Sequence, residues 1–174
     1  MELSAAQRER YERNLLVEGF TDRMQQALIA ARVAVVGAGG LGSAALNYLV
    51  AAGVGHLTLI ENDTVSLSNL QRQELYTTAD MGRPKAEVAA MRLSRLNPGC
   101  DIRVVTDRLT AANAAGLLGG HDAVVDCTDN YDARYVIDDF CREAEVPMIY
   151  GTAEAVGGQV AVFHAGGAGG YRDL

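Results

Sequence analysis

The hexapeptide GAGGLG, residues 37–42, constrains the fold of this chain more than any other feature. It follows the apolar run RVAVV, which is typical of a buried strand, and its end opens the alanine- and leucine-rich segment LGSAALNYLVAAG, which predicts a helix. Glycines between a strand and a helix allow a tight turn and a close approach of a ligand to the backbone. This order predicts a βαβ unit with a nucleotide at the helix N-terminus.

Strands and helices alternate along the rest of the chain. We expect helices over 4–14, 21–30, 41–53, 82–99, 110–120 and 130–146. We expect strands over 32–37, 56–61, 101–109, 121–127, 147–154 and 157–164. Residues 62–79 show no clear period and predict a loop with a short helical turn. Because the last two strands follow one another, the prediction is an α/β fold: a Rossmann-like, doubly wound, mostly parallel sheet with a mixed or antiparallel edge and N-terminal helices.

Length and charge limit the classes of protein. A chain of 174 residues suits a single domain over 1–174, with an N-terminal helical arm over 1–30 and a loose glycine-rich tail over 165–174. The formal net charge of −7 disfavours a nucleic-acid partner. The N-terminus lacks the apolar core of a signal peptide, and no apolar stretch is long enough for a membrane span. Three cysteines without a C-x-x-C pair indicate reduced thiols, so we expect a cytoplasmic protein.

The glycine turn by itself does not distinguish NAD from ATP or FAD. Gly37 and Gly39 suit a tight turn beside a phosphate, and Gly42 lets the helix pack close to its strand. Glu61 ends the next strand, about twenty residues further on, where a carboxylate accepts hydrogen bonds from ribose hydroxyls. The turn therefore predicts a nucleotide site whose ligand must be identified from other residues.

The segment SLSNLQRQ, residues 66–73, favours a polyphosphate over a nicotinamide. Arg72 can pair with phosphate oxygens in a fork, and Asn69 and Gln71 can donate hydrogen bonds. Lys85 begins a helix, where its charge opposes the helix dipole unless it faces an anion. A dehydrogenase has no need of such a group directly after its ribose carboxylate.

Another candidate ligand-binding segment, VVDCTDN, spans residues 124–130 and contains two carboxylates. Its two carboxylates, Asp126 and Asp129, follow an apolar strand, and ligands of open α/β sheets bind at such strand ends. A carboxylate there can hold Mg²⁺ that bridges phosphates. Together with the cations of the preceding segments, this predicts a polyphosphate–magnesium site.

The motifs GAGGLG, IEND, SNLQRQ, GRPKAE and DCTDN occur in an order and spacing that resemble the ThiF/MoeB/HesA family of adenylyltransferases. The resemblance runs from Arg10 to about Phe163. It implies an enzyme that uses ATP and Mg²⁺ to adenylate the C-terminal glycine of a ubiquitin-fold sulfur-carrier protein ending in Gly-Gly. The carboxylate of the carrier attacks the α-phosphate, and pyrophosphate leaves.

The glycine turn and the resemblance together give one set of predicted nucleotide-binding residues: Gly37, Gly39, Gly40, Gly42, Glu61, Ser68, Asn69, Leu70, Gln71, Arg72, Lys85, Asp129 and Asn130. The residues implied to be catalytic are Arg13, Arg72, Lys85 and Asp129, with Asp129 as the magnesium ligand. The family usually has Asp where this chain has Glu61, which keeps the charge on a longer side chain. The resemblance also implies that Arg13 reaches into the site of a neighbouring protomer, so a homodimer is expected.

Two departures from the family leave other functions open. Gly170 to Asp173 stand where relatives carry their first zinc-binding cysteine pair, so we predict no zinc site, and the chain ends at Leu174, short of the usual length. A nucleotide-binding partner subunit without activity is therefore one alternative. An NAD-dependent oxidoreductase is another, although its acid or base is hard to find, because the three histidines lie at expected strand ends: His56, His121 and His164. Cys127, also at a strand end, is expected to pack rather than to react.

Overall fold

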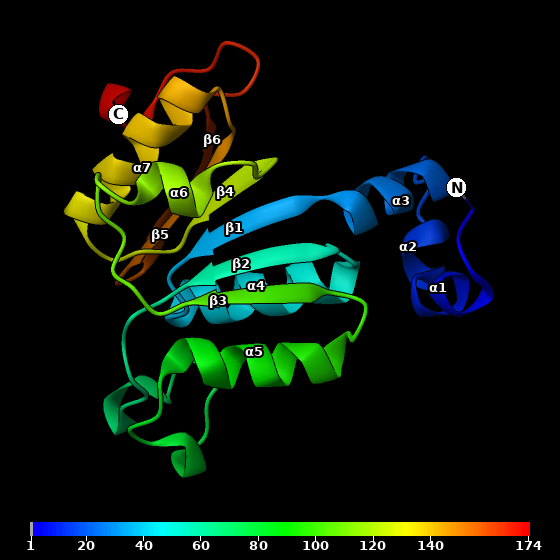
Figure 1. Cartoon of the computed structure of the whole chain (residues 1–174), viewed down its shortest axis with the longest axis horizontal. Coiled ribbons are helices and arrows are strands. Elements are labelled where there is room, and N and C mark those ends of the chain that lie inside the picture. The colour runs from blue at the N-terminus through cyan, green and yellow to red at the C-terminus, as the bar shows by residue number, and fades with distance from the viewer. Residues whose placement is uncertain (1) are drawn as a thin grey trace.

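A computed structural model describes residues 2–174 and shows one six-stranded sheet with helices on both faces (Figure 1). The strand order is β3-β2-β1-β4-β5-β6, and every neighbouring pair is parallel except β5–β6. The strands are β1 (Arg32–Val36), β2 (His56–Ile60), β3 (Asp101–Val105), β4 (Ala123–Asp126), β5 (Met148–Glu154) and β6 (Gly157–Phe163). The predicted fold class, including the antiparallel edge, is confirmed.

Residues 2–174 also form seven helices and three short 3₁₀ turns, which precede, connect or follow these strands. The helices are α1 (Ala5–Arg10), α2 (Glu12–Leu15), α3 (Asp22–Ala30), α4 (Gly40–Ala52), α5 (Lys85–Leu96), α6 (Ala114–Leu118) and α7 (Tyr131–Ala144). The turns are η1 (Leu67–Asn69), η2 (Thr78–Asp80) and η3 (Tyr171–Asp173). In the described part of the chain, no helix is both long and apolar enough to cross a membrane.

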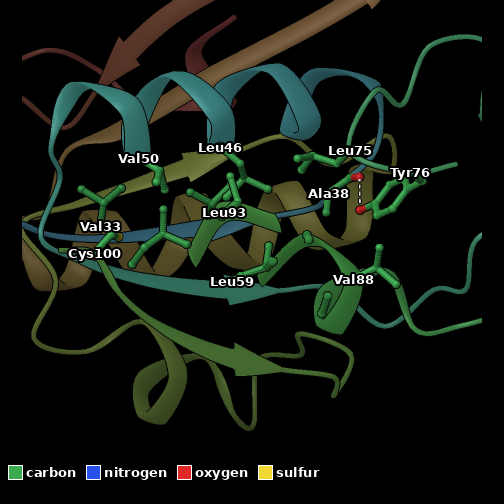
Figure 2. Close-up of a cluster of buried hydrophobic side chains, with 14 of the residues drawn as sticks. Val33, Ala38, Leu46, Val50, Leu59, Leu75, Tyr76, Val88, Leu93 and Cys100 are labelled. Atoms are coloured by element: carbon green, nitrogen blue, oxygen red, sulfur yellow. Dashed lines mark hydrogen bonds between the residues drawn. The ribbon is translucent and has the colours of Figure 1, made fainter. Parts of the chain in front are cut away.

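Two apolar cores lie on opposite faces of the sheet, which explains why β1 is apolar at nearly every position. Val33 and Val35 of β1 belong to the core under α4 and α5, whereas Ala34 and Val36 belong to the core under α6 and α7. Figure 2 shows the first core, with Leu46 and the other labelled side chains filling the space between the helices and the sheet. Because successive strand residues point to opposite faces, a central strand must be apolar throughout.

Several expected elements are shorter in the structure, and hydrogen bonds of Asn97 to distant segments explain two of the boundaries. The helix predicted over 4–14 is interrupted at Tyr11, whose buried hydroxyl accepts a hydrogen bond from Asn97. The helix predicted over 82–99 starts after Pro84 and ends at Leu96, because the Asn97 side chain also donates to the carbonyl of Val50. The strand predicted over 101–109 ends at 105, and the helix predicted over 110–120 covers only 114–118.

The tail predicted to be loose over 165–174 needs correction at its end. The backbone N–H of Tyr171 donates to the buried carboxylate of Asp138, and its ring lies 5.1 Å from the ring of Tyr150. Arg172 pairs with Asp139 at 2.9 Å. Tyr171 and Arg172 therefore anchor the end of this glycine-rich segment against α7. The glycine content of the segment did not indicate these contacts.

Candidate functional site

A cleft of about 680 Å³ opens where the parallel strands end. Its wall contains residues from the segments that directly follow β1, β2, β3 and β4, and from β5 itself. One residue from each, in chain order, is Gly37, Glu61, Asp107, Asp129 and Thr152. Ligands of doubly wound sheets bind at this edge, because the strand order reverses there and the loops diverge. The predicted nucleotide residues that line the cleft are Gly37, Gly39, Gly40, Glu61, Arg72, Lys85, Asp129 and Asn130.

The turn between β1 and α4 can be built only from glycine at two positions. Gly37 has φ +94°, and a side chain there would meet the carbonyl oxygen of Cys127 at 2.7 Å. A side chain at Gly42 would lie 2.1 Å from the carbonyl oxygen of Gly37. Gly39 caps α4 without any side-chain acceptor, so the first N–H groups of the helix are left for a ligand.

Tyr76 ties the segment after η1 to the glycine turn. Its buried hydroxyl donates to the carbonyl oxygen of Ala38 over 2.8 Å, as Figure 2 shows. Burial raises the pKa of the Tyr76 phenol, and the carboxylates of Glu61 and Asp63 raise it further, so the hydroxyl stays protonated. The turn is thus held by a residue 38 positions away in the chain.

We expect Tyr76→Phe to lower the free energy of unfolding by about 1 kcal/mol, because Ala38 would lose its main hydrogen-bond donor. Urea unfolding measures the difference. Tyr48→Phe is the matched control, since Tyr48 is 76% exposed, and it should leave stability unchanged. Equal stabilities of the two variants would contradict the role given to Tyr76.

The carboxylate of Glu61 accepts hydrogen bonds from two backbone N–H groups beside the glycine turn. Its Oε2 accepts from the N–H of Ala38 at 2.8 Å, and its Oε1 accepts from the N–H of Asp63 at 2.9 Å. A carboxylate oxygen has further acceptor capacity, so both oxygens can still bind a ribose hydroxyl. The ribose role of Glu61 stays a prediction, and the structure adds that the side chain also fixes the turn.

Lys85 is a buried cation at the cleft wall. Its side chain is 5% exposed, and its Nζ lies 2.5 Å from Oδ2 of Asp63, which is 61% exposed. This hydrogen bond holds the pKa of Asp63 below its usual range. Lys85 is the first residue of α5, as expected, and Asp63 is the partner that the sequence did not reveal. A phosphate in the cleft would therefore meet a lysine that is already fixed in place.

The segment SNLQRQ contributes fewer residues to the cleft than predicted. Arg72 and Gln73 line it, and the guanidinium of Arg72 donates to the carbonyl of Ser68 at 3.4 Å. The other four predicted residues of the segment lie outside the cleft wall: Ser68, Asn69, Leu70 and Gln71. The backbone carbonyl of Asn69 instead accepts from the N–H groups of residues 72 and 73 and so shapes the loop. Their nucleotide contacts stay predictions, and Gln73 is a wall residue that we did not assign.

The two carboxylates after β4 have different surroundings. Asp126 is fully buried, its Oδ2 accepts from Arg134 at 3.2 Å, and its Oδ1 accepts from the N–H and hydroxyl of Thr128. Burial raises the pKa of Asp126, although Thr128 and Arg134 act in the opposite direction. Asp129 is exposed at the cleft. The adjacent Asn130 caps α7 by accepting from the N–H of Ala133 at 2.9 Å.

Arg13 does not reach the cleft of its own chain. It is an exposed residue of α2, and the N-terminal helices lie beyond the start of β1 in Figure 1, whereas the cleft is at the strand ends. Gly42 also lies outside the cleft wall, since it packs against Gly37. The contribution of Arg13 to a neighbouring protomer stays a prediction.

The remaining reactive side chains have structural partners. Burial raises the pKa of Cys127, which lines the cleft, to about 12, so its thiol is protonated and a poor nucleophile. His121 bridges the Leu118 carbonyl and the Thr58 hydroxyl, and His164 bonds the buried Asp138. Within residues 2–174, no group of three or more histidines, cysteines and carboxylates is placed to hold a metal ion.

Comparisons with known proteins agree with the motifs. Residues 11–174 match the ThiF family. The molybdopterin-synthase adenylyltransferase of Salmonella typhimurium is 49% identical over 162 residues, which are 93% of this chain and 65% of that protein. The sulfur carrier protein adenylyltransferase of Thermus thermophilus is 46% identical over 156 residues, or 90% of this chain and 58% of that protein. The chain thus spans less than two thirds of the length of these relatives.

A solved structure that contains ATP has the same fold. The tRNA N6-threonylcarbamoyladenosine dehydratase TcdA of Escherichia coli, in complex with ATP, superimposes with a TM-score of 0.80 at 32% identity. The match covers 86% of this chain and 61% of that one.

Proposed function

The chain belongs to the ThiF family, and from this premise we propose that it is an ATP-dependent adenylyltransferase of a ubiquitin-fold sulfur-carrier protein. A C-terminal glycine carboxylate of the carrier attacks the α-phosphorus of ATP. A phosphorus–oxygen bond to the carrier forms, the bond to the bridging oxygen of pyrophosphate breaks, and the products are an acyl-adenylate and pyrophosphate. No general base is needed, because a glycine carboxylate is ionised near neutral pH.

One observation carries the proposal: a single cleft holds an uncapped helix N-terminus, three basic side chains and an exposed carboxylate. The helix begins after Gly39, and the carboxylate is Asp129. The basic residues of the wall are Arg72, Lys85 and Arg108. Positioned positive groups stabilise the charge that moves from the α-phosphate onto pyrophosphate. Rossmann dehydrogenases hold the pyrophosphate of NAD at the helix N-terminus, whereas several cations together with a carboxylate that can bind Mg²⁺ suit a triphosphate, so ATP is favoured over NAD.

Magnesium is part of this proposal. Asp129 is exposed at the cleft, and it has no hydrogen-bond or ion-pair partner among residues 2–174. Proteins typically bind Mg²⁺ with one or two carboxylates and leave the remaining positions to phosphate oxygens and water. Asp129 therefore fits as the protein ligand, and the ion would neutralise phosphate charge.

A second hollow beside the nucleotide cleft is where we propose that the carrier tail lies. It measures about 450 Å³ and shares Thr152 with the nucleotide cleft. Its other walls include Tyr150 and the pair Gly157–Gly158, which lack side chains beside the β5–β6 edge. A narrow, extended Gly-Gly segment suits such a passage, since glycine adds no side-chain bulk.

We further propose a homodimer in which Arg13 adds a further cation to the site of the partner. This accounts for an exposed arginine at the far side of its own sheet, next to the exposed apolar residues Leu16 and Val17. We also propose that residues 1–174 form one domain, with residues 1–30 as a helical arm. The cytoplasmic location predicted from the cysteine pattern stays a prediction.

Calorimetry with Mg²⁺ separates ATP from NAD: we expect saturable ATP binding and no NAD⁺ binding, because the basic side chains and the metal-binding carboxylate of the cleft suit a triphosphate rather than a pyrophosphate between two nucleosides. ATP–pyrophosphate exchange then separates an enzyme from an inactive subunit. The probes are small ubiquitin-fold proteins that end in Gly-Gly. Exchange that depends on a carrier supports the proposal. ATP binding without exchange for any carrier points to a partner subunit, and NAD⁺ binding alone points to an oxidoreductase.

A further inference from the structure

The carboxylate of Asp138 on α7 holds both ends of one loop of the C-terminal segment. Its Oδ1 accepts from Nε2 of His164 at 2.7 Å and from the backbone N–H of Tyr171 at 2.7 Å. Asp138 is fully buried, and the side chain of His164 is only 8% exposed. Hydrogen bonds to a buried, charged acceptor are stronger than hydrogen bonds in water. One oxygen atom therefore closes the loop 164–171 against α7.

Few other contacts fix this loop. Residues 165–170 are glycine and alanine only, and such a backbone has high conformational entropy when it is free. The second oxygen of Asp138, Oδ2, forms no hydrogen bond within residues 2–174, and Nε of Arg172 lies 4.0 Å from it. The hydrogen bonds of the Asp138 side chain are thus all directed at the two ends of the loop.

Gly170 lies directly against this carboxylate. A Cβ atom added to Gly170 would lie 2.8 Å from Oδ1 of Asp138 and 2.7 Å from Cε1 of His164. These distances are shorter than van der Waals contact, and close-packed interiors do not absorb such an overlap without a shift. The loop can therefore adopt this position only with glycine at residue 170.

The residue that Asp138 positions, Tyr171, forms part of the wall of the second hollow. Its ring lies 5.1 Å from the ring of Tyr150 and 5.6 Å from the guanidinium carbon of Arg134, and both of these residues also line the hollow. Asp138 and His164 do not line it. Asp138 therefore acts on the shape of the hollow through Tyr171.

We propose that Tyr171 contacts the tail of the carrier protein and that Asp138 is the positioning residue that sets its ring in the wall of the hollow. This rests on the proposed function in that the carrier tail occupies the second hollow, which meets the nucleotide cleft at Thr152. A glycine backbone can lie flat on an aromatic ring, because it carries no side chain. Asp138 thus controls the affinity for the carrier and leaves the nucleotide cleft unchanged.

Three variants test this inference in carrier-dependent ATP–pyrophosphate exchange: Tyr171→Leu removes the ring, Asp138→Ala removes the acceptor, and Gly170→Ala displaces the loop. The probe is a ubiquitin-fold protein ending in Gly-Gly that supports exchange with the wild-type chain. We expect each variant to raise the KM for this carrier about tenfold, the loss typical of one aromatic contact. The exchange rate at saturating carrier and the Kd for ATP should stay within about twofold of the wild-type values.

Amide hydrogen exchange, measured by NMR on the ligand-free protein, tests the position of Tyr171 separately. Its N–H should be protected in the wild type and should exchange at least about tenfold faster in Asp138→Ala and Gly170→Ala. Asp138→Asn keeps an oxygen that can accept from this N–H, so protection and the KM for the carrier should stay within about threefold of the wild-type values. Glu143→Ala is the matched control on α7. Glu143 is exposed, and it has no hydrogen-bond or ion-pair partner among residues 2–174, so both measurements should stay unchanged.

Other results contradict the inference. An unchanged KM in Tyr171→Leu shows that the ring does not contact the carrier. An unchanged KM in Gly170→Ala, which keeps every side chain of the wall, shows that the position of the loop does not matter, and this variant decides if Asp138→Ala does not fold. A variant that loses affinity for ATP and for the carrier equally shows a general effect on folding. Wild-type protein without exchange for any carrier contradicts the proposed function instead, and protection of the Tyr171 N–H still shows whether Asp138 positions this residue.

Discussion

Lys85→Met is expected to lower the rate of carrier-dependent ATP–pyrophosphate exchange by about 10²–10³-fold, the loss seen when one donor that stabilises transition-state charge is removed. The reason is the geometry of the cleft: Lys85 is 5% exposed and fixed by Asp63, so its charge is already in position for a phosphate. Methionine keeps the apolar stem and removes the charge. The exchange rate at saturating ATP is the measurement.

Arg83→Met is the matched control for this prediction. Arg83 carries the same charge two residues earlier, but it pairs with Asp80 outside the cleft wall. It should keep exchange within about threefold of the wild-type rate, since distant surface charges are screened. Both variants should unfold in urea near the wild-type midpoint, because Asp63 remains mostly solvated without Lys85. Equal exchange rates in the two variants would remove Lys85 from the proposed mechanism.

Asp126→Ala is expected to lower the free energy of unfolding by about 3–5 kcal/mol, the cost of leaving a buried charge without its partner. The Arg134 side chain is only 7% exposed, and its Nε donates to Asp126. The same change removes the acceptor of the Thr128 N–H and hydroxyl, which hold the loop that carries Asp129. Urea unfolding measures the stability. Titration of the folded variant with ATP measures its affinity for ATP, which should fall if the loop that carries Asp129 is displaced.

Two further variants test whether the unpaired charge of Arg134 causes the loss of stability in Asp126→Ala. Asp139→Ala removes a carboxylate that pairs with Arg142 and Arg172 but is 41% exposed, so it should cost less than about 1 kcal/mol. Asp126→Leu combined with Arg134→Met replaces the buried pair by apolar groups and should recover much of the stability. A double variant as unstable as Asp126→Ala would show that the charge of Arg134 is not the cause.

The sequence motifs predicted the main elements of the site because each has a local signature. A glycine turn between a strand and a helix specifies a helix N-terminus at a sheet edge, and Lys85 after Pro84 marks the start of another helix. The apolar runs fixed the central strands, since both faces of those strands are buried. Boundaries were less predictable, because residues such as Asn97 end a helix through contacts with distant segments.

The sequence by itself thus determined the class of fold, the glycine turn and the charges available to a phosphate. Only the tertiary structure decided which glutamine of the irregular segment after β2 faces the cleft: Gln73 rather than Gln71. It also supplied Asp63 as the partner of Lys85. The physical reason is that periodicity reports burial in helices and strands, whereas side-chain directions in loops are set by hydrogen bonds and ion pairs between distant residues, such as Tyr76 and Ala38.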